Sequence, residues 1–200
     1  MNILIPTVSP ESVEALVFDL GGVLLDVQLQ RTLRAFEALD IRGLGAAEVI
    51  DGNRACFRDL ELGLITQEEF AEAVRRTFPA VAAIPDAQRV ELLRELGKRC
   101  PVYLLSNTNL PHRIRFRESF RERFGGSFDE LFVRCFYSDE LHLRKPDPEI
   151  YRSVARQIGT PPGKLLFIDD NAANVSAARG EGWQACHLTG GITVTDLFEL

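Results

Sequence analysis

The sequence predicts an α/β protein built on a doubly wound parallel sheet, with a small all-helical segment inserted after the first strand. Three observations support this fold class. Short apolar runs, each bounded by turn residues, are typical of buried parallel strands. Helical patterns alternate with these runs along most of the chain. The stretch from about residue 26 to residue 95 breaks the alternation, because it contains helical patterns and no convincing strand.

Five apolar runs are expected to form the sheet. Their ranges are 15–18, 102–105, 133–137, 165–168 and 185–188. The first run ends at Asp19, the second at Ser106 and the fourth at Asp169. Ligands of such sheets bind beyond the carboxyl ends of the strands, so these three residues mark the edge where a site is expected.

The helices between the strands begin at recognisable residues. Asp147 followed by Pro148 indicates an N-cap with proline at the first helical position. Another helix is expected from Asn171 to about Ala178, before the glycines at 180 and 182. A further helix is expected after Asp86, at the end of the inserted stretch.

We therefore divide the chain into a core, residues 1–25 and 96–200, and an inserted helical segment, residues 26–95. We expect this segment to close over the strand ends and exclude water. One of its expected helices carries four side chains that could reach the pocket, although a solvent-facing explanation serves the two arginines equally well. These are Asn53, Arg54, Phe57 and Arg58.

Composition excludes several classes of protein. The chain has 200 residues, of which 46% are hydrophobic and 26% charged, as in ordinary globular domains. With 23 basic and 29 acidic residues the net charge is −6, opposite to the balance typical of nucleic-acid-binding proteins. No apolar run approaches a membrane span, and the N-terminus lacks the pattern of a secretory signal. We expect no nucleic-acid or membrane partner and a cytoplasmic location.

The four cysteines, at positions 56, 100, 135 and 186, are far apart and form no Cys-x-x-Cys or Cys/His motif. We interpret them as reduced core residues and not as a zinc or redox site. A basic stretch from 112 to 124 interleaves arginines with Phe116, Phe120 and Phe124. The four-residue spacing favours an amphipathic helix with a buried aromatic stripe over a nucleic-acid site. His112 and Arg113 follow Ser106 closely enough to approach a phosphate there.

Acidic residues at two strand ends carry the chemical argument. Asp19 precedes Gly21 and Gly22, and the pair Asp169–Asp170 ends a second strand. Taken separately, the first is explained as a turn former and the second as a helix cap. Taken together, converging carboxylates repel one another and raise each other's pKa unless a cation intervenes. Oxygen ligands of this kind suit Mg²⁺.

Two further segments could hold an anion beside such a metal. Lys145, just before a helix start, supplies a fixed positive charge, although taken singly a solvated loop lysine is the simpler explanation. Ser106, Asn107, Thr108 and Asn109 supply hydroxyl, amide and backbone donors just before another helix. Helix N-termini favour phosphate groups.

These residues together resemble a known family. Asp19, Ser106, Lys145 and the pair Asp169–Asp170 match, in order, the four motifs of the haloacid dehalogenase (HAD) superfamily, and the resemblance covers about residues 14–190. The phrases Leu-Ser-Asn-Thr-Asn, Arg-Lys-Pro-Asp-Pro-Glu-Ile-Tyr and Phe-Ile-Asp-Asp-Asn-Ala-Ala-Asn are similar to a phosphatase-like subgroup that includes bacterial glucose-1-phosphate phosphatases. The resemblance implies a Rossmann-like core and a helical cap in the long interval after the first motif.

The resemblance also implies roles for the site residues. Asp19 is the expected nucleophile, forming an aspartyl-phosphate that water hydrolyses, while Ser106 and Lys145 hold the phosphoryl oxygens. The expected substrate-binding residues are Asn107, Thr108 and Asn109. The expected Mg²⁺ ligands are Asp19, the carbonyl of Gly21, Asp169 as a ligand or as a partner of one, and Asp170. Asn174 is expected just outside this ligand set, where it could hold a water of the metal.

Gly21 departs from the family's pattern. Most phosphatases and mutases of the superfamily carry a second Asp two residues after the nucleophile, and it protonates the leaving group. Its loss removes assistance typically worth about 10²–10⁴-fold, which disfavours a phosphomutase and favours substrates with good leaving groups. A 2-haloacid dehalogenase is also disfavoured, because its Asp-x-Tyr-Gly-Thr start is absent.

We therefore expect a Mg²⁺-dependent phosphatase acting on a small phosphorylated metabolite, such as a sugar or acyl phosphate. The alternative is a phospholigand-binding or regulatory protein with weak or no turnover. A monomer or weak dimer is expected.

Overall fold

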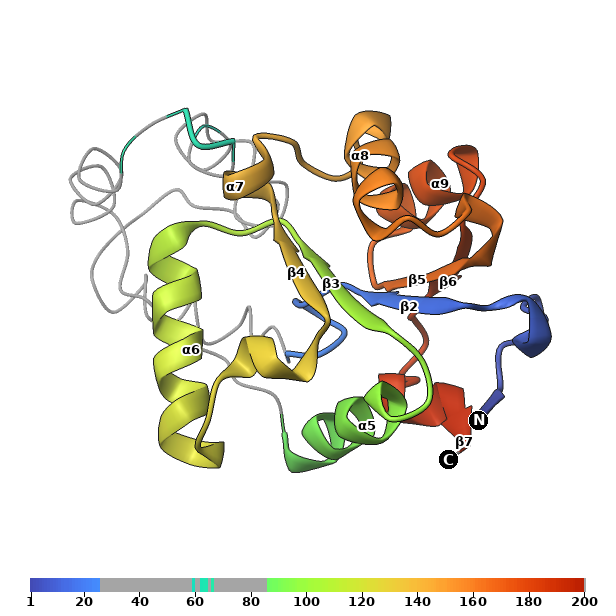
Figure 1. Ribbon diagram of the computed structural model, residues 1–200, viewed down its shortest axis with the longest axis horizontal. Coiled ribbons are helices and arrows are strands. Elements are labelled where there is room, and N and C mark those ends of the chain that lie inside the picture. The colour runs from blue at the N-terminus through green and yellow to red at the C-terminus, as the bar shows by residue number, and fades with distance from the viewer. Residues whose placement is uncertain (26–58, 60–61, 65, 67–85, 200) are drawn as a thin grey trace.

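The computed structural model describes residues 1–25, 59, 62–64, 66 and 86–199. Its centre is a five-stranded sheet in the order β4-β3-β2-β5-β6, in which every neighbouring pair is parallel (Figure 1). The strands are β2 (Ala15–Phe18), β3 (Val102–Ser106), β4 (Arg134–Tyr137), β5 (Leu165–Asp169) and β6 (Gln184–His187). The predicted doubly wound parallel sheet is confirmed, and the five strands match the five apolar runs.

Strand β2 lies at the middle of the sheet, between β3 and β5. All four of its residues are buried, because helices cover both faces of the sheet. Leu16 and Phe18 pack in one hydrophobic layer, whereas Ala15 and Val17 pack in the other. The chain winds outward from β2 in both directions, so the carboxyl end of β2 is the topological switch point where ligands of such sheets bind.

The first layer contains α5 (Ala87–Gly97) and α6 (Leu110–Phe124). The carboxylate of Asp86 caps α5 by accepting a 2.8 Å hydrogen bond from the backbone nitrogen of Arg89, and the helix begins after Asp86 as predicted. Val90, Leu93 and Leu96 of α5 pack in the same buried cluster as the sheet residues of this face. Residues 87–95, which the sequence analysis placed in the cap, therefore pack against the core sheet.

Almost all of the remaining predicted cap lies outside the described residues, including Asn53, Arg54, Phe57 and Arg58. Its helical structure and its role in substrate selection stay predictions. Within the described residues of this stretch, the carbonyl of Leu62 accepts a 2.6 Å hydrogen bond from Nδ1 of His142. Residues 62–64 therefore lie against the loop that leads to Lys145.

The aromatic stripe of α6 faces the core, with Phe116 and Phe120 buried and Phe124 partly buried, which confirms the predicted amphipathic helix. The rings of Phe116 and Phe120 contact that of Phe128 edge-on, with centroids 5.1 and 5.4 Å apart. Phe128 belongs to η2 (Phe128–Leu131), a short 3₁₀ helix before β4. This aromatic packing holds α6 against the sheet beside the end of β3.

The second layer contains α8 (Pro148–Ile158) and α9 (Ala172–Gly180), which lie together on the other side of the sheet (Figure 1). Both predicted helix starts are confirmed, since the side chains of Asp147 and Asn171 accept hydrogen bonds from the first turns. The rings of Tyr151, Phe167 and Trp183 pack edge-on in this layer. The cap at Asn171 begins α9 immediately after β5.

The remaining elements are short and were not predicted. Strand β1 (Asn2–Ile3) pairs antiparallel with β7 (Phe198–Glu199), which brings the two ends of the described chain together (Figure 1). One turn of helix, α7 (Ser138–Leu141), follows β4. Three more 3₁₀ helices are η1 (Pro10–Ser12), η3 (Pro162–Lys164) and η4 (Val194–Leu197).

The described residues bear on the predictions about the cysteines and about membrane-spanning helices. The three cysteines among them, Cys100, Cys135 and Cys186, are free thiols, and burial raises the pKa of each. No helix in the described part of the chain is long and apolar enough to cross a membrane. Cys56 lies outside the described residues.

Candidate active site

Asp19 stands directly beyond the carboxyl end of β2. Its backbone nitrogen donates a 2.9 Å hydrogen bond to the carbonyl of Ile168, which continues the pairing of β2 with β5 for one more residue. The chain then turns sharply, and the backbone nitrogen of Gly22 bonds the carbonyl of Leu25 at 2.8 Å. The turn therefore fixes the backbone on both sides of the Asp19 side chain.

Gly22 is a position in this turn where a side chain has no room. Its φ of +73° lies in the left-handed region. A Cβ atom at this position would lie 1.9 Å from Oδ2 of Asp170. The missing side chain allows the Asp170 carboxylate to lie directly against the turn that follows Asp19.

Three carboxylates consequently gather at the centre of this sheet edge. Asp19, Asp169 and Asp170 each offer an oxygen, and these oxygens all lie within 4.8 Å of one another. Burial raises the pKa of Asp19 to about 7 against the favourable charge of Lys145, and the neighbouring Asp169 raises it further. Burial and the charge of Asp169 likewise raise the pKa of Asp170. In both residues burial is the main cause, so a nearby positive charge would stabilise the ionised carboxylates.

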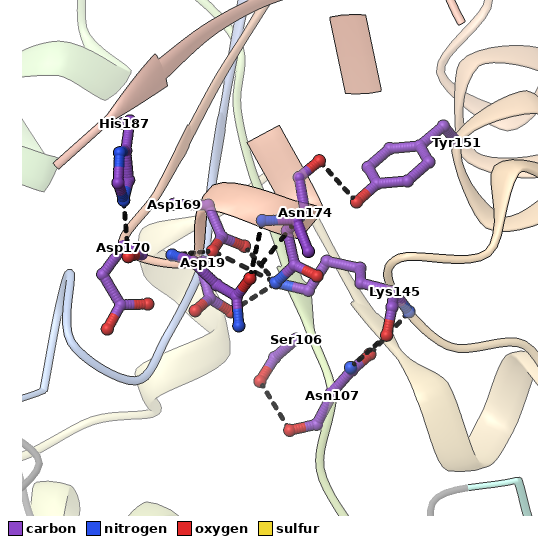
Figure 2. A network of polar contacts seen from close by, with 11 residues as sticks. Asp19, Ser106, Asn107, Lys145, Tyr151, Asp169, Asp170, Asn174 and His187 are labelled. Atoms are coloured by element: carbon purple, nitrogen blue, oxygen red, sulfur yellow. Dashed lines mark hydrogen bonds and ion pairs between the residues drawn. The ribbon is translucent and has the colours of Figure 1, made fainter. Parts of the chain in front are cut away.

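Lys145 supplies part of that charge. Its Nζ lies 2.6 Å from Oδ1 of Asp19 and 2.8 Å from Oδ2 of Asp169, between the two carboxylates (Figure 2). Burial disfavours the charged ammonium, but the two carboxylates outweigh burial and raise the pKa of Lys145 above its ordinary value. Three carboxylates and one ammonium leave an excess of negative charge, which a divalent cation with a preference for oxygen ligands would balance.

Asp169 is held far more completely than the other two carboxylates. It is fully buried, and its Oδ1 accepts a 2.7 Å hydrogen bond from the backbone nitrogen of Asn171. Nδ2 of Asn174 lies 3.1 and 3.0 Å from its two oxygens, and Lys145 donates to Oδ2. Asp169 is therefore arranged to orient Lys145, and Asn174 is arranged to orient Asp169.

Asp170 is the open carboxylate of the cluster, since the residue is exposed to solvent. Its backbone carbonyl accepts a 2.9 Å hydrogen bond from Nε2 of His187 at the end of β6, so the ring nitrogen at that position carries a proton (Figure 2). Among the predicted metal ligands, Asp19 and Asp170 therefore have the freest oxygens.

The predicted phosphate-binding segment follows β3 at the same edge. The Ser106 hydroxyl is buried and lies 3.5 Å from the carbonyl oxygen of Asn107, too far for a strong hydrogen bond. The Asn107 side chain bonds the backbone of Lys145 on both sides, with Oδ1 accepting from its nitrogen at 2.9 Å and Nδ2 donating to its carbonyl at 2.8 Å. Ser106 has a weakly engaged hydroxyl, whereas Asn107 is engaged by the protein itself.

The other two predicted substrate-binding residues also have internal partners. Oγ1 of Thr108 lies 3.1 Å from Nδ1 of His112, and the Thr108 backbone is bonded on both sides by the Ser138 hydroxyl. The side chain of Asn109 caps α6 by accepting a 3.0 Å hydrogen bond from the His112 backbone. These side chains therefore shape the loop, and a substrate contact from them stays a prediction.

Arg113 does not point to the carboxylate cluster. It is buried, it pairs with Asp139 at 2.7 Å and with Glu140, and its guanidinium lies over the Tyr137 ring. Burial lowers the pKa of His112, which favours a neutral ring in its contact with Thr108. Arg113 thus joins α6 to the end of β4, whereas His112 contacts the loop that follows β3.

Sequence reasoning missed the two side chains that hold the loops together. Asn107 was assigned to the substrate, and Ser138, which directly follows β4, was given no role. Their partners lie 38 and 30 positions away along the chain, and neither pairing forms a motif. One available signal was that Ser106 ends β3 and Ser138 directly follows β4, so the two residues were expected at the same edge of the sheet.

Comparisons with known proteins agree with this geometry. The family model of haloacid dehalogenase-like hydrolases matches residues 13–182. A sesquiterpene phosphatase of Aspergillus oryzae is 33% identical to the chain over 88% of the chain and 90% of its own length. A D-ribitol-5-phosphate phosphatase of Bacteroides thetaiotaomicron is 25% identical, over 86% of the chain and 90% of its own length.

A similar solved structure is that of a HAD family enzyme from Bacteroides thetaiotaomicron in complex with magnesium and inorganic phosphate. Its TM-score is 0.79 at 27% identity, and the match covers 94% of this chain and 100% of the other. The narrower likeness to glucose-1-phosphate phosphatases, inferred from three phrases of sequence, stays a prediction.

Proposed function

The chain belongs to the haloacid dehalogenase-like hydrolases, and from that premise we propose that it is a Mg²⁺-dependent phosphatase of small phosphorylated metabolites. Hydrolase activity is the property that the chain shares with its phosphatase relatives. The observation that supports the finer proposal is the convergence of Asp19, Asp169 and Asp170, with the ammonium of Lys145 paired to the first two. Such a site can hold a divalent cation and a phosphoryl group side by side.

The residues present fit a magnesium ion. Asp19 and Asp170 supply the freer carboxylates, the backbone carbonyl of Gly21 is the third expected ligand, and Asp169 supports the set through Lys145. Mg²⁺ commonly binds through one or two carboxylates together with waters and substrate phosphate. When bound, it would offset the negative charge of the phosphoryl oxygens.

In the proposed reaction, a carboxylate oxygen of Asp19 attacks the phosphorus atom. A bond forms between that oxygen and phosphorus, and the bond from phosphorus to the leaving oxygen breaks. Water then attacks the aspartyl-phosphate at phosphorus, which releases phosphate and restores the carboxylate. In this proposal Lys145, which pairs with Asp19, and the buried Ser106 hydroxyl hold the phosphoryl oxygens during both steps.

Gly21 limits which substrates this reaction suits. With a hydrogen atom as its side chain, it provides no acid to protonate the leaving oxygen, so that oxygen departs as an anion or takes its proton from water. Acyl, aryl and anomeric phosphates, whose leaving groups are stabilised anions, should therefore react best. A series of aryl phosphates of graded leaving-group acidity should give rates that rise steeply with acidity, and equal rates would refute this reading.

The substrate panel can be chosen from the relatives. They act on D-ribitol 5-phosphate and on sesquiterpene phosphates, which share a phosphate and differ in the group that carries it. Phosphate release should be measured with sugar, polyol, terpenyl and acyl phosphates in three samples: the protein with Mg²⁺, the protein with EDTA, and Asp19→Asn with Mg²⁺. We expect release in the first sample alone.

A binding or regulatory role is the second candidate, and the missing acid at Gly21 is the observation that favours it. Under that reading, the protein and Asp19→Asn would be equally inert towards the whole panel while both still bound Mg²⁺ and a phosphorylated ligand. Calorimetric titration with Mg²⁺ and inorganic phosphate measures that binding without any turnover.

A further inference from the structure

The Asn107 side chain forms a two-point clamp on the main chain of Lys145. Oδ1 accepts from the Lys145 nitrogen at 2.9 Å, and Nδ2 donates to the Lys145 carbonyl at 2.8 Å (Figure 2). An amide side chain reproduces here the pair of hydrogen bonds that a neighbouring strand would make. The backbone of Lys145 is therefore fixed from the end of β3, although it lies 38 positions further along the chain.

The main-chain position of Lys145 decides where its ammonium lies. The side chain is only 1% exposed, and its Nζ is within 2.6 Å of Asp19 and 2.8 Å of Asp169. The ring of Phe167 packs 5.2 Å from the same nitrogen. Because an enclosed side chain of this length has little freedom, a shift of the backbone would move the charge relative to both carboxylates.

We propose that Asn107 is a positioning residue that acts through Lys145, and that it is not a ligand of the substrate. This inference rests on the proposed function, because it gives Lys145 a part in phosphoryl transfer. The clamp sets the distance between the ammonium and the attacking oxygen of Asp19, and a misplacement of about 1 Å at such a site can cost about 100-fold in rate.

Ser138, at the start of α7, makes a second clamp of the same kind and serves as a matched comparison. Its hydroxyl accepts from the Thr108 backbone nitrogen at 3.0 Å and donates to the Thr108 carbonyl at 3.1 Å. It therefore makes the same pair of hydrogen bonds to Thr108, the residue next to Asn107, from the position directly after β4. Both clamps involve the loop that follows β3. Of the two, the Asn107 clamp is the one that bonds Lys145.

Kinetics on an aryl phosphate separate positioning from substrate binding. Asn107→Ala should lower kcat about 10–100-fold with a smaller change in KM. Ser138→Ala should lower the melting temperature, because it leaves the buried backbone groups of Thr108 without a partner, and should change kcat little. If Asn107 acts through Lys145, adding Asn107→Ala to Lys145→Ala should cost almost nothing further, whereas multiplied losses would show an independent contact with substrate.

Lysine labelling tests the same point without turnover. Limiting acetic anhydride is added to the protein, and acetylation at each lysine is read by peptide mass spectrometry. Lys98 and Lys164 have exposed side chains and serve as internal references. We expect Lys145 to be protected in the natural protein and in Ser138→Ala, and to be acetylated several-fold faster in Asn107→Ala.

The outcomes distinguish this inference from the proposed function. If the natural protein releases phosphate but Asn107→Ala keeps both its kcat and its protected Lys145, the positioning role is wrong. If the natural protein shows no turnover on any substrate, the proposed function is wrong, and the labelling alone decides whether Asn107 fixes the lysine.

Discussion

The ends of β2 and β5 each carry an aspartate into the same site, but the two carboxylates are held in different ways. The Asp19 side chain keeps 12% of its surface exposed and has Lys145 on one oxygen. Asp169 has no exposed surface, and both its oxygens accept hydrogen bonds. A carboxylate that must attack needs a free oxygen, whereas one that orients a lysine is best fully occupied.

The residues that follow each aspartate cause this difference. After Asp19 come Leu20, Gly21 and Gly22, which turn the chain without offering a polar side chain. After Asp169 the chain enters α9, and the backbone nitrogen of Asn171 donates to Asp169 as part of that helix start. Two similar strand ends thus carry a partly free carboxylate, the proposed nucleophile, and a fully bonded carboxylate, which supports Lys145.

Replacing the reactive carboxylate should have the largest effect. Asp19→Asn removes the proposed nucleophile and should lower kcat by roughly 10⁴-fold or more, since loss of a nucleophile is rarely compensated. Mass spectrometry of acid-quenched protein should find a phosphorylated Asp19 peptide in the natural protein during turnover. If Asp19→Asn kept ordinary turnover, Asp19 would not be the nucleophile, and the proposed difference in role between Asp19 and Asp169 would be wrong.

Replacing the supporting carboxylate should act on both stability and rate. Asp169→Asn leaves Lys145 with one partner in a buried site and should destabilise the fold by about 3 kcal/mol. We expect kcat to fall about 100-fold, because the ammonium is no longer fixed. Urea unfolding and steady-state kinetics measure the two effects. A loss of rate with full stability would mean that Asp169 acts on the metal and not through the lysine.

Gly22→Ala should weaken metal binding. The new methyl group would collide with Asp170 and add strain at a positive φ, so the carboxylate must move away. The Mg²⁺ concentration for half-maximal activity should rise about 10–100-fold, with much of the rate restored at high Mg²⁺. Gly159→Ala, at another positive φ with open space around it, is the control for strain alone. An unchanged Mg²⁺ requirement would remove Asp170 from the ligand set.

Gly21→Asp should have the smallest effect and should make the β2 end more active. A carboxylic acid at this position could protonate the leaving oxygen, which we expect to speed hydrolysis of alkyl phosphates by about 10-fold. Aryl phosphates with acidic leaving groups should gain little, so the graded series should become flatter. A uniform loss across the series would show that the turn does not tolerate a side chain at 21.

The sequence predicted the sheet and the edge of the site for the same physical reason. Strands buried on both faces appear in the sequence as runs of four or five apolar residues, so the strands and the polar residues at their ends can be recognised from the sequence. The pairing of β1 with β7 could not be predicted in this way, because two residues form no pattern.

Within the site, the types of residue predicted which side chains lie together, but the sequence did not predict their hydrogen-bond partners. Asp19, Lys145 and Asp169 were predicted to lie together, and they do. The clamp of Asn107 on Lys145 could not be found, since an amide side chain that bonds a backbone leaves no trace in the pattern of its partner. The same limitation hid the saturation of Asp169 by its neighbours.

The alternation of β2 between two hydrophobic layers has a consequence for the accuracy of the active site. Leu16 and Phe18 anchor one layer while Ala15 and Val17 anchor the other, so a slip of one residue would exchange the layers and bury large side chains where small ones fit. Such a slip would also leave Phe18 or Leu20 standing where the acid must be. A chain with this slip would be less stable and would lack the proposed nucleophile at the site, so the packing of β2 and the position of Asp19 depend on the same strand register.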